Sequence, residues 1–550
     1  MMLSKRWRGL TMMALAVTLT LAFALPAQAQ RDTGIMNVQA IDPDGAPLPG
    51  VMVVARGPVG TQTQYTGVDG TARFPGLYPG NYTATFSLDG FKTIVREGLT
   101  IQAQRTTAFS MTMELASVEE TVTVTGKSPV VDVKSANIAG LYSDDLIDKT
   151  PTASGIWAGV LDHVPGIVSS NDVGGGASGQ QSTPIAWGSE STNNSYNVNG
   201  GDTTDPAATG ASSSYFSTGS FEEVSVSLAS QDIEIRTPGV NMNMVVKSGS
   251  NDWHAGVKYF YEGPSLVSSN VDAELEAQGI TEGTPNELLS DLDIQGGGPI
   301  WKDRAWFFVD YWNFEIQTKV LGLTETDGTD LDDWTINLNG QVNDNNKISG
   351  RFIHTKKYRN NRGAGRDSPY LGWIQDSNTK IPQLQWQSVI NQNIFSDVRY
   401  STVRSNFPLV RRGPGTSEPD VPYQNWSATY DFFYGQYLPR PSNPTYEFFD
   451  ERDTDNLNGT VSWYVTGEQI SHDIKFGWNY TWINYFGPYN YPDGYRRYTR
   501  GNFDPMGNPN WMITFPDTGE TLPAVPVEVR LYGAPIAGQD GGSPDCFVLN

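Results

Sequence analysis

Hydrophobic and polar residues alternate along many segments in the second half of the chain. In residues 457–466, every second side chain is apolar or small, and those between them are polar. The alternation resumes after a Gly-Glu-Gln turn, over residues 470–485, with an aromatic apolar face. A period of two residues is typical of a β-strand with one apolar and one polar face. The two segments predict a β-hairpin with the apolar residues Leu457, Gly459, Val461, Trp463 and Val465, then Ile474, Phe476, Trp478, Tyr480 and Trp482.

Seven further segments after residue 250 follow the same scheme. They are residues 253–261, 289–300, 304–315, 334–342, 347–357, 381–390 and 394–403. A strand that crosses a membrane needs about nine to eleven tilted residues, with apolar side chains towards lipid and polar ones inward. We therefore predict the N-terminal part of a large antiparallel transmembrane β-barrel over residues 251–550. Its short turns would face the periplasm, and long segments such as 404–453 and 486–550 would be extracellular loops.

The first residues are typical of an export signal. Basic residues within 5–8 precede an apolar run over 10–25, and Ala-Gln-Ala at 27–29 forms a cleavage site. We predict a signal peptide over 1–29 and a mature chain that begins at Gln30. Loss of three basic residues changes the formal charge from −23 to −26, and such acidity argues against nucleic acid as a partner. A single cysteine excludes an internal disulfide.

Residues 30–116 carry turn dipeptides at intervals of roughly ten residues between short apolar runs, which predicts a small antiparallel β-sandwich. The turns are Asp44-Gly45, Pro49-Gly50, Asp69-Gly70, Pro79-Gly80 and Asp89-Gly90. The order DPDGAPLPGVMV, then TGVDGTARFPGLYPGNYTATFSLDGFKT, resembles the carboxypeptidase regulatory-like domain. That resemblance implies a transthyretin-like sandwich that is non-catalytic. Fold analogy alone connects such modules with carbohydrate binding.

Residues 129–250 predict a mixed α+β domain. A helix is expected over 152–163, and strands are expected at 224–228 and 242–247. Four pieces of this region resemble, in their order, the plug domain of TonB-dependent outer-membrane receptors: LIDKTPTASGIWAGVLDHVPGI, YNVNGGDTTD, FEEVSVSLAS and PGVNMNMVVKSGSNDWHAG. With the preceding domain, and with GGGPIWKDRAWFFVDY at 296–311, the whole is similar to the Oar-like group of these receptors.

The resemblance implies a receptor and transporter in the outer membrane of a Gram-negative-type bacterium, with its N-terminal domain in the periplasm. A ligand too large for porins would bind the outer loops and the plug, including residues 169–216. TonB, driven by an inner-membrane complex, would then pull a periplasmic strand and rearrange the plug. The alternative is an outer-membrane-anchored adhesion or surface-assembly protein that could bind carbohydrate. A soluble array of β-sandwiches is a third interpretation, and it predicts a protein that needs no detergent.

A short extended segment, residues 117–128, connects the first two domains. Its β-branched residues predict either a last strand of the sandwich, or a linker, or a strand that adds to the sheet edge of another protein. From its position we predict that TonB binds here. The residues of this TonB box are Glu120, Thr121, Val122, Thr123, Val124 and Thr125.

The nine predicted strands are too few to close a barrel around a plug domain. Barrels that hold a plug have about 22 strands. An open edge in lipid would leave unpaired N–H and C=O groups, each at a cost of several kcal/mol. We therefore expect the sequence to be the N-terminal fragment of a chain of about 1,000 residues, counted by strands.

The sequence contains no recognisable catalytic pattern, so we expect a protein that is not an enzyme. It has no HExxH or GxSxG motif, and its four histidines are scattered. Acidic residues at 327, 330, 332 and 333 are expected at the base of a loop, as solvated charges whose spacing does not fit an EF-hand. No residue pattern implies a cofactor. The expected partners are outer-membrane lipid, TonB and an extracellular ligand whose identity the sequence does not reveal.

Overall fold

The computed structural model describes most of the chain up to residue 487 and short strands beyond it. Described are residues 32–116, 121–125, 138–150, 155–169, 179–229, 235, 237–269, 271–278, 283–320, 326–363, 373–411, 429–431, 436–437, 447–465, 472–487, 489–490, 495–499, 512–514, 521–523, 526–531 and 547–548. The predicted signal peptide, Glu120 and Cys546 lie outside these residues. In the part described, no helix has both the length and the apolar composition of a membrane span.

The N-terminal domain is the β-sandwich that the turn spacing predicts. A sheet of order β4-β1-β7 faces a sheet of order β3-β2-β5-β6-β8. Phe74, Phe86 and Leu99 are fully buried between them. Each such side chain contributes about 1.5–3 kcal/mol to folding. The strands are β1 (Gly34–Ile41), β2 (Met52–Arg56), β3 (Thr61–Tyr65), β4 (Thr71–Leu77), β5 (Gly80–Ser87), β6 (Thr93–Ile101), β7 (Thr106–Thr112) and β8 (Thr121–Thr125).

The second domain, residues 138–246, is called the plug below. Its sheet has the order β13-β12-β15-β14-β9, and Trp157, Phe221 and Met242 are buried in its core. The single helix predicted over 152–163 is wrong: the described residues form α3 and η1, which Val160 separates with a non-helical backbone. The elements are β9 (Ile138–Ser143), α2 (Asp144–Lys149), α3 (Ile156–Gly159), η1 (Leu161–His163), β10 (Ile167–Val168), β11 (Ile185–Ala186), η2 (Ser191–Asn193), β12 (Ser195–Val198), β13 (Gly201–Asp202), η3 (Thr218–Ser220), β14 (Phe221–Ala229) and β15 (Asn241–Val246).

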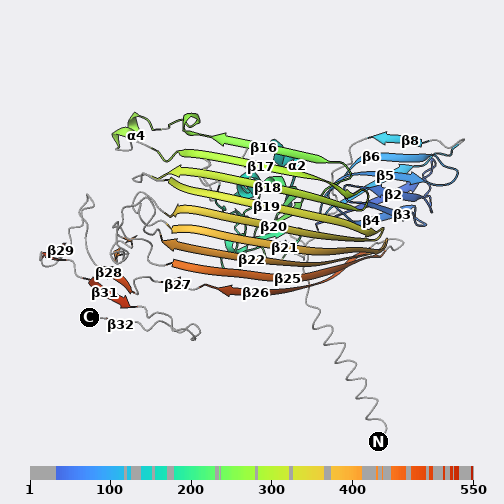
Figure 1. Ribbon diagram of the computed structural model, residues 1–550. Helices are drawn as coiled ribbons and strands as arrows, with labels where there is room; N and C mark the ends of the chain where they lie inside the picture. The colour runs from blue at the N-terminus through green and yellow to red at the C-terminus, as the bar shows by residue number, and fades with distance from the viewer. Residues whose placement is uncertain are drawn as a thin grey trace, which may run out of the picture.

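Nine long strands follow in antiparallel succession and are called the large sheet below (Figure 1). Every one of the nine strands expected from alternation is present. The elements are β16 (His254–Glu262), η4 (Pro264–Leu266), α4 (Ala273–Ala277), β17 (Asn286–Trp301), β18 (Ala305–Lys319), β19 (Thr326–Asn343), β20 (Asn346–Arg362), β21 (Trp373–Asn391), β22 (Ile394–Arg411), β25 (Glu447–Val465) and β26 (His472–Phe486). The short strands are β23 (Thr429–Asp431), β24 (Gln436–Tyr437), β27 (Tyr489–Asn490), β28 (Tyr495–Thr499), β29 (Met512–Thr514), β30 (Thr521–Pro523), β31 (Pro526–Leu531) and β32 (Phe547–Val548).

Most of the long strands extend well beyond their predicted ends. The segment 404–453 is not all loop, because β22 continues to Arg411 and β25 starts at Glu447. The prediction that the acidic cluster lies at the base of a loop is also wrong, because the cluster lies within β19. The period of two residues divides it between the two faces: Asp333 is fully buried inside, whereas Asp332 accepts a hydrogen bond from Tyr311 outside, at 2.9 Å.

The two faces of the large sheet differ as the alternation predicts. On the outer face, Trp463 and Trp478 are each 45% exposed. On the inner face, Asn458 and Thr460 are buried although they are polar. This arrangement inverts that of a water-soluble protein, in which a long aromatic face would be covered. It fits a sheet whose outer side meets lipid.

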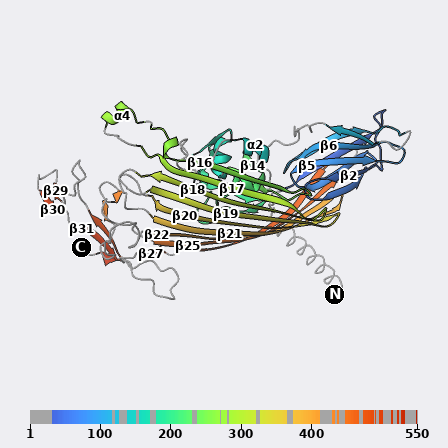
Figure 2. The ribbon, with the colours of Figure 1, turned by 45° about the horizontal axis from the view of Figure 1, so that its top comes forward.

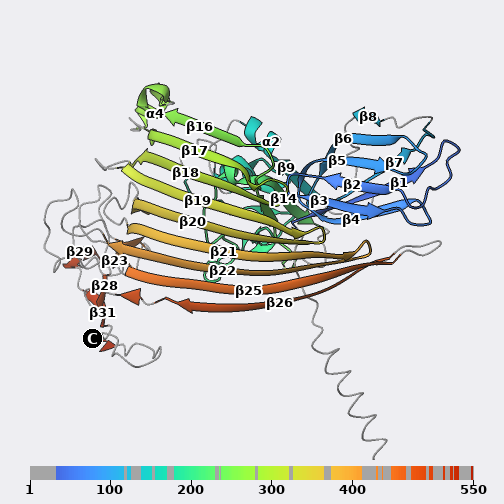
Figure 3. The ribbon, with the colours of Figure 1, turned by 45° about the vertical axis from the view of Figure 1, so that its right-hand side comes forward.

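The plug and the sandwich follow each other along the length of the large sheet (Figures 1 and 2). The plug lies against the inner face of the large sheet, where Phe308, Ile353 and Val403 of the strands join its hydrophobic core. The sandwich lies at the end with the short turns, and α4, β28 and β31 lie at the other end (Figure 3). Among the described strands the large sheet is open, with β16 and β26 at its edges.

Leu384 provides a test of the lipid-facing side. It lies near the middle of β21 and is 56% exposed on the outer face. Leu384→Arg should lower the free energy of unfolding by about 2–4 kcal/mol, because a cation near the bilayer midplane loses hydration. Urea unfolding in lipid vesicles, followed by tryptophan fluorescence, measures this change. Leu384→Phe is the matched control. Equal stability of all three proteins would show that this face does not contact lipid.

Candidate functional site

A cavity of about 720 Å³ lies between the plug and the inner face of the large sheet. Its lining includes Arg362 at the end of β20, Gln375 near the start of β21 and Arg452 near the start of β25. Plug residues within 180–215 form the other side. The cavity therefore lies at the end of the large sheet with the long connections, away from the sandwich.

Five charged side chains line the cavity, and four of them are basic. They are Lys357, Arg359, Arg362, Arg452 and, from the plug, Asp205. Arg359 donates to Asp327 through Nε at 2.8 Å, and Arg452 bridges Asp205 at 2.5 Å and Asp450 at 2.7 Å. Three arginines thus face three carboxylates, and the buried amine of Lys357 adds hydrogen-bond donors to the same lining.

Lys357 is buried and held by oxygen atoms of uncharged groups. Its Nζ donates to Gly179 O at 3.1 Å, to Gln180 Oε1 at 2.6 Å and to Tyr215 Oη at 2.8 Å. The ammonium also lies 4.0 Å from the centroid of the Tyr215 ring, where the electron-rich face attracts a cation. These contacts fix a positive group at the floor of the cavity and attach the plug to β20.

Two arginines share one aromatic ring at the side of the cavity. The Cζ atoms of Arg362 and Arg452 lie 5.1 and 4.4 Å from the centroid of Phe407. Arg362 also donates to the side-chain oxygen of Gln375. A guanidinium beside an aromatic ring still has N–H donors that can make planar, bidentate contact with a carboxylate or phosphate.

Hydroxyl–carboxylate pairs attach the plug to the first strands of the large sheet. Ser217 donates to Asp293 at 2.7 Å, and Ser220 donates to Asp310 at 2.5 Å. Gly219 lies between the two serines, and a Cβ there would stand 1.9 Å from Asp293 Oδ2. Only glycine permits this close approach. These pairs add to the apolar packing of the plug against Phe308, Ile353 and Val403 of the large sheet.

Two buried glutamates lie where the plug meets the sandwich. Glu223 of β14 accepts the backbone N–H of Ala103 at 3.1 and 3.3 Å through its two oxygens. Burial raises the pKa of Glu223 to about 8, and burial with the nearby Asp144 raises the pKa of Glu222 to about 7. While the two domains are in contact, Glu223 is therefore mostly protonated at neutral pH, and Glu222 is about half protonated.

The residues predicted as a TonB box form an edge strand. Thr121–Thr125 are β8, which pairs in parallel with β6 in a register that joins Ile94 with Val122. Glu120 lies outside the described residues. Among the described strands, β6 is the neighbour of β8, so the opposite edge of β8 is open. The strand is thus the last of the sandwich, and its role as a TonB box stays a prediction.

The sequence analysis did not single out the basic lining of the cavity. One signal was available in the predicted hairpin. Lys357 is an even number of residues from Ser349, so both side chains lie on the same, polar face of the strand. Arg362 and Arg452 lie beyond the strand ends that alternation indicated. The segment 169–216 was expected to touch ligand, and its described part, from residue 179, does line the cavity.

Comparison with known proteins identifies the relatives of the chain. A family model described as carboxypeptidase regulatory-like domain matches residues 36–114, so the predicted sandwich type is confirmed. Over 268 residues the chain is 29% identical to the TonB-dependent transporter Oar from Myxococcus xanthus, which covers 48% of this chain and 25% of Oar. This chain is a homologue of Oar. The match confirms the predicted resemblance to the Oar-like group and spans a quarter of the length of Oar.

The fold is also that of a solved transporter. The outer membrane transporter YddB from Escherichia coli matches with a TM-score of 0.50 and 12% identity, over 72% of this chain and 53% of YddB. At this identity the likeness concerns the fold alone. The chain thus spans about half the length of YddB. The match confirms a mainly β architecture in which a plug lies against strands of an outer-membrane barrel.

The raised pKa values predict that contact between plug and sandwich weakens as pH rises. A carboxyl with a pKa above its ordinary value of 4.5 holds its proton in the buried state and releases it when exposed. Stability is therefore lost from pH 4.5 upward and levels off above the buried pKa, near 8 for Glu223. Protection of the Ala103 amide against hydrogen exchange, corrected for intrinsic rate, should fall by up to about tenfold per pH unit per proton released.

Glutamine variants separate the two groups. Glu223→Gln should reduce the slope, and the double variant Glu222→Gln/Glu223→Gln should abolish it, because the amides do not titrate. Mass spectrometry of the exchanging protein reports both. An unchanged slope in the double variant would show that these carboxyls do not control the contact.

Proposed function

We propose that this chain is the plug-bearing part of a TonB-dependent outer-membrane receptor that takes up a large ligand, with the sandwich in the periplasm after removal of the signal peptide. The observation that carries the proposal is a folded plug, bonded through polar groups to the inner face of a sheet whose outer face is apolar and aromatic. A soluble array of sandwiches would cover that face. Relatives by sequence and by fold are transporters.

The cavity supports an acidic group in the ligand. Its lining holds three arginines, two of them beside the ring of Phe407. A carboxylate or phosphate would replace the water around these groups by charge-assisted hydrogen bonds. A bound ligand would act directly on the plug, because Asp205 of the plug pairs with Arg452 across the cavity. An anion that competes for Arg452 would loosen this link between plug and sheet.

The position of β8 supports its use by TonB. It lies on the sandwich, at the short-turn end of the large sheet, where a periplasmic partner would reach it (Figure 1). An edge strand presents alternate N–H and C=O groups outward, so a strand of TonB can add to it through main-chain hydrogen bonds. The side chains of the segment would then contribute little, in keeping with their simple Thr-Val alternation.

Substitution within β8 tests this assignment. Val122→Pro removes one N–H donor and fixes a backbone angle, so the variant should lose binding to the purified periplasmic domain of TonB. Val122→Thr keeps the donor and the β-branched shape, and it should bind like wild type. Biolayer interferometry on the protein in lipid nanodiscs measures both. Unchanged binding by Val122→Pro would place the TonB contact elsewhere.

Charge-matched peptides test the cavity. A short aspartate peptide should bind the protein in nanodiscs at least about tenfold more tightly than the same peptide built from asparagine, because only the former forms ion pairs with the arginines. Arg362→Gln should remove most of that difference, whereas Lys302→Gln, far from the cavity, should leave it. Isothermal titration calorimetry gives the affinities. Equal affinity for both peptides would exclude recognition of an acidic group.

A further inference from the structure

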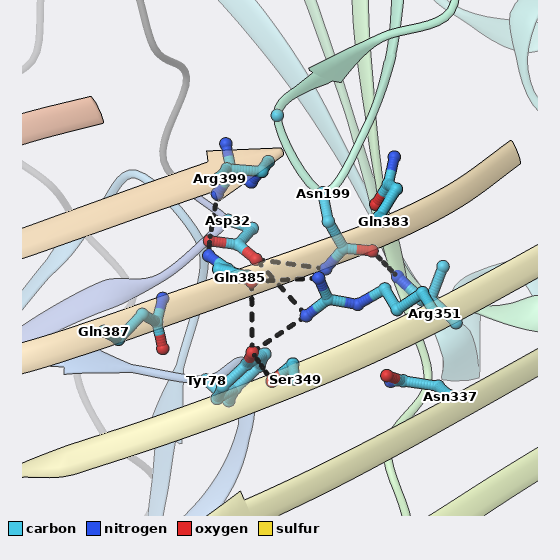
Figure 4. A network of polar contacts seen from close by, with 12 residues as sticks. Asp32, Tyr78, Asn199, Asn337, Ser349, Arg351, Gln383, Gln385, Gln387 and Arg399 are labelled. Carbon is cyan, nitrogen blue, oxygen red and sulfur yellow. Dashed lines mark hydrogen bonds and ion pairs between the residues drawn. The ribbon is translucent and has the colours of Figure 1, made fainter. Parts of the chain in front are cut away.

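The sandwich, the plug and the large sheet meet at one buried carboxylate, that of Asp32 (Figure 4). Two groups of the sheet reach its Oδ1: Gln385 Nε2 donates at 3.1 Å, and an Nη atom of Arg399 lies at 3.2 Å. The plug reaches Oδ2 through Asn199 Nδ2 at 3.1 Å, and Arg351 of the sheet lies 3.7 Å from the same oxygen. Asp32 thus connects all three parts of the chain.

A second side chain of the sandwich enters the same cluster. Tyr78, between β4 and β5, has its hydroxyl 2.8 Å from Ser349 Oγ and accepts a hydrogen bond from Arg351 at 2.8 Å. Its ring packs with Val59 of the sandwich and Trp306 of the large sheet, and all three are buried. The sandwich therefore inserts one carboxylate and one phenol among the inner side chains of the sheet, well inside its short-turn end.

Charge balance makes Asp32 necessary to this contact. Arg351 and Arg399 are both buried on the inner face of the large sheet. Asp397 of the same face lies 3.4 Å from Arg399 and is the other carboxylate of the described cluster. Without Asp32, two buried cations would share one anion. A buried charge without a partner is strongly destabilising, so the sheet offers a cationic site that the sandwich fills.

The outer contacts of the sandwich are more exposed. Arg56 and Asp303 form an ion pair at 2.6 Å, but their side chains are 61% and 51% exposed. Arg73 pairs with Asp473 at 3.0 Å and lies over the Tyr464 ring. The exposed Arg56–Asp303 pair contributes little. The Arg73 side chain is only 12% exposed, so its ion pair is partly buried. The centre around Asp32 differs from both pairs because its carboxylate and the arginines beside it are buried.

The plug is coupled to the centre through a tight turn. Asn199 and Gly200 form the two-residue turn between β12 and β13, with φ angles of 46° and 71° that suit a hairpin of this length. Asn199 Oδ1 accepts the N–H of Val246, while its Nδ2 donates to Asp32. One amide thus joins β15 of the plug to the carboxylate that holds the sandwich. Displacement of this turn removes a partner of Asp32.

We propose that the sandwich is an inner gate of the transport path, locked by Asp32 and Tyr78 in the large sheet and released when the plug moves. The proposal rests on the proposed uptake function, because release needs a pulled plug. A path cleared by the plug alone would still meet the sandwich at the short-turn end (Figure 3). The turn at Asn199 links movement of the plug to release of the sandwich. When the plug moves, Asp32 loses its hydrogen bond from Asn199, and the sandwich is held less firmly.

Thiol accessibility tests the lock. In a Cys546→Ser background, Ser349→Cys places a thiol under Tyr78, and Ser401→Cys places one under the plug turn, where a Cβ on Gly201 would lie 3.0 Å from Ser401 Oγ. Asp32→Ala should speed labelling of Cys at 349 by a small hydrophilic maleimide at least about tenfold, and Asp32→Asn should do so less. Labelling at 401 should stay slow.

Two outcomes would overturn the lock. Position 349 could stay protected in Asp32→Ala, which would show that Asp32 does not hold the sandwich. Both positions could become reactive together, which would show that the change unseats the plug and that there is no separate gate.

Living cells separate the lock from the proposed function. In spent growth medium, labelling at 349 should be faster in energised cells than in cells treated with a protonophore, because TonB uses the proton-motive force. Asp32→Ala could speed labelling at 349 while the protonophore leaves the labelling rate unchanged in protein that retains Asp32. The lock would then be supported, and the proposal that TonB releases it would be wrong. If Asp32→Ala has no effect, the lock is wrong whatever the protonophore does.

Discussion

The buried polar inner face of the large sheet is the constraint on which the rest of the structure depends. Because alternate side chains point to opposite faces, a sheet with an apolar outer face carries polar groups on the other. Groups such as Asp293, Asp310 and Asn337 are buried and would be costly without hydrogen-bond partners. The plug supplies one partner to each carboxylate through Ser217 and Ser220, and the carbonyl of Lys247, just after the plug, accepts from Asn337. The plug therefore completes the large sheet as much as it blocks it.

The same constraint acts at both ends of the sheet, with different results. At the short-turn end, the arginines at 351 and 399 are paired by Asp32 and Asp397, and little space is left. At the other end, Arg362 and Arg452 border a cavity of about 720 Å³. Both clusters contain carboxylates of the chain itself, but the second also borders this cavity. In the proposed function, arginine on the inner face would serve attachment in one place and recognition in the other.

Much of the fold could be predicted from the sequence, because its strongest signals are local. Alternation located all nine long strands, and Gly-containing turns located the sandwich. Strand ends such as Arg362 and Glu447 were missed, since polar residues beyond the apolar band no longer alternate. The clusters around Asp32 and Phe407 could not be predicted, because they join residues of different strands or domains that are far apart in the sequence. Only the register of the strands brings these side chains together.

The plug is joined to the large sheet by apolar packing and by polar contacts at two levels. The plug is held at its top by Lys357 and Arg452 and near its base by the Asn199 turn, so no single contact carries the whole domain. In the proposed function, ligand binding would act on the first set, and a pull from the periplasm would act on the second. Because Asn199 belongs to a turn next to β15, a force that strains the plug sheet reaches Asp32 over a short distance. Opening would then proceed in separate steps, each of which breaks few contacts. The free-energy barrier of each step is lower than the barrier to removing the plug and the sandwich together.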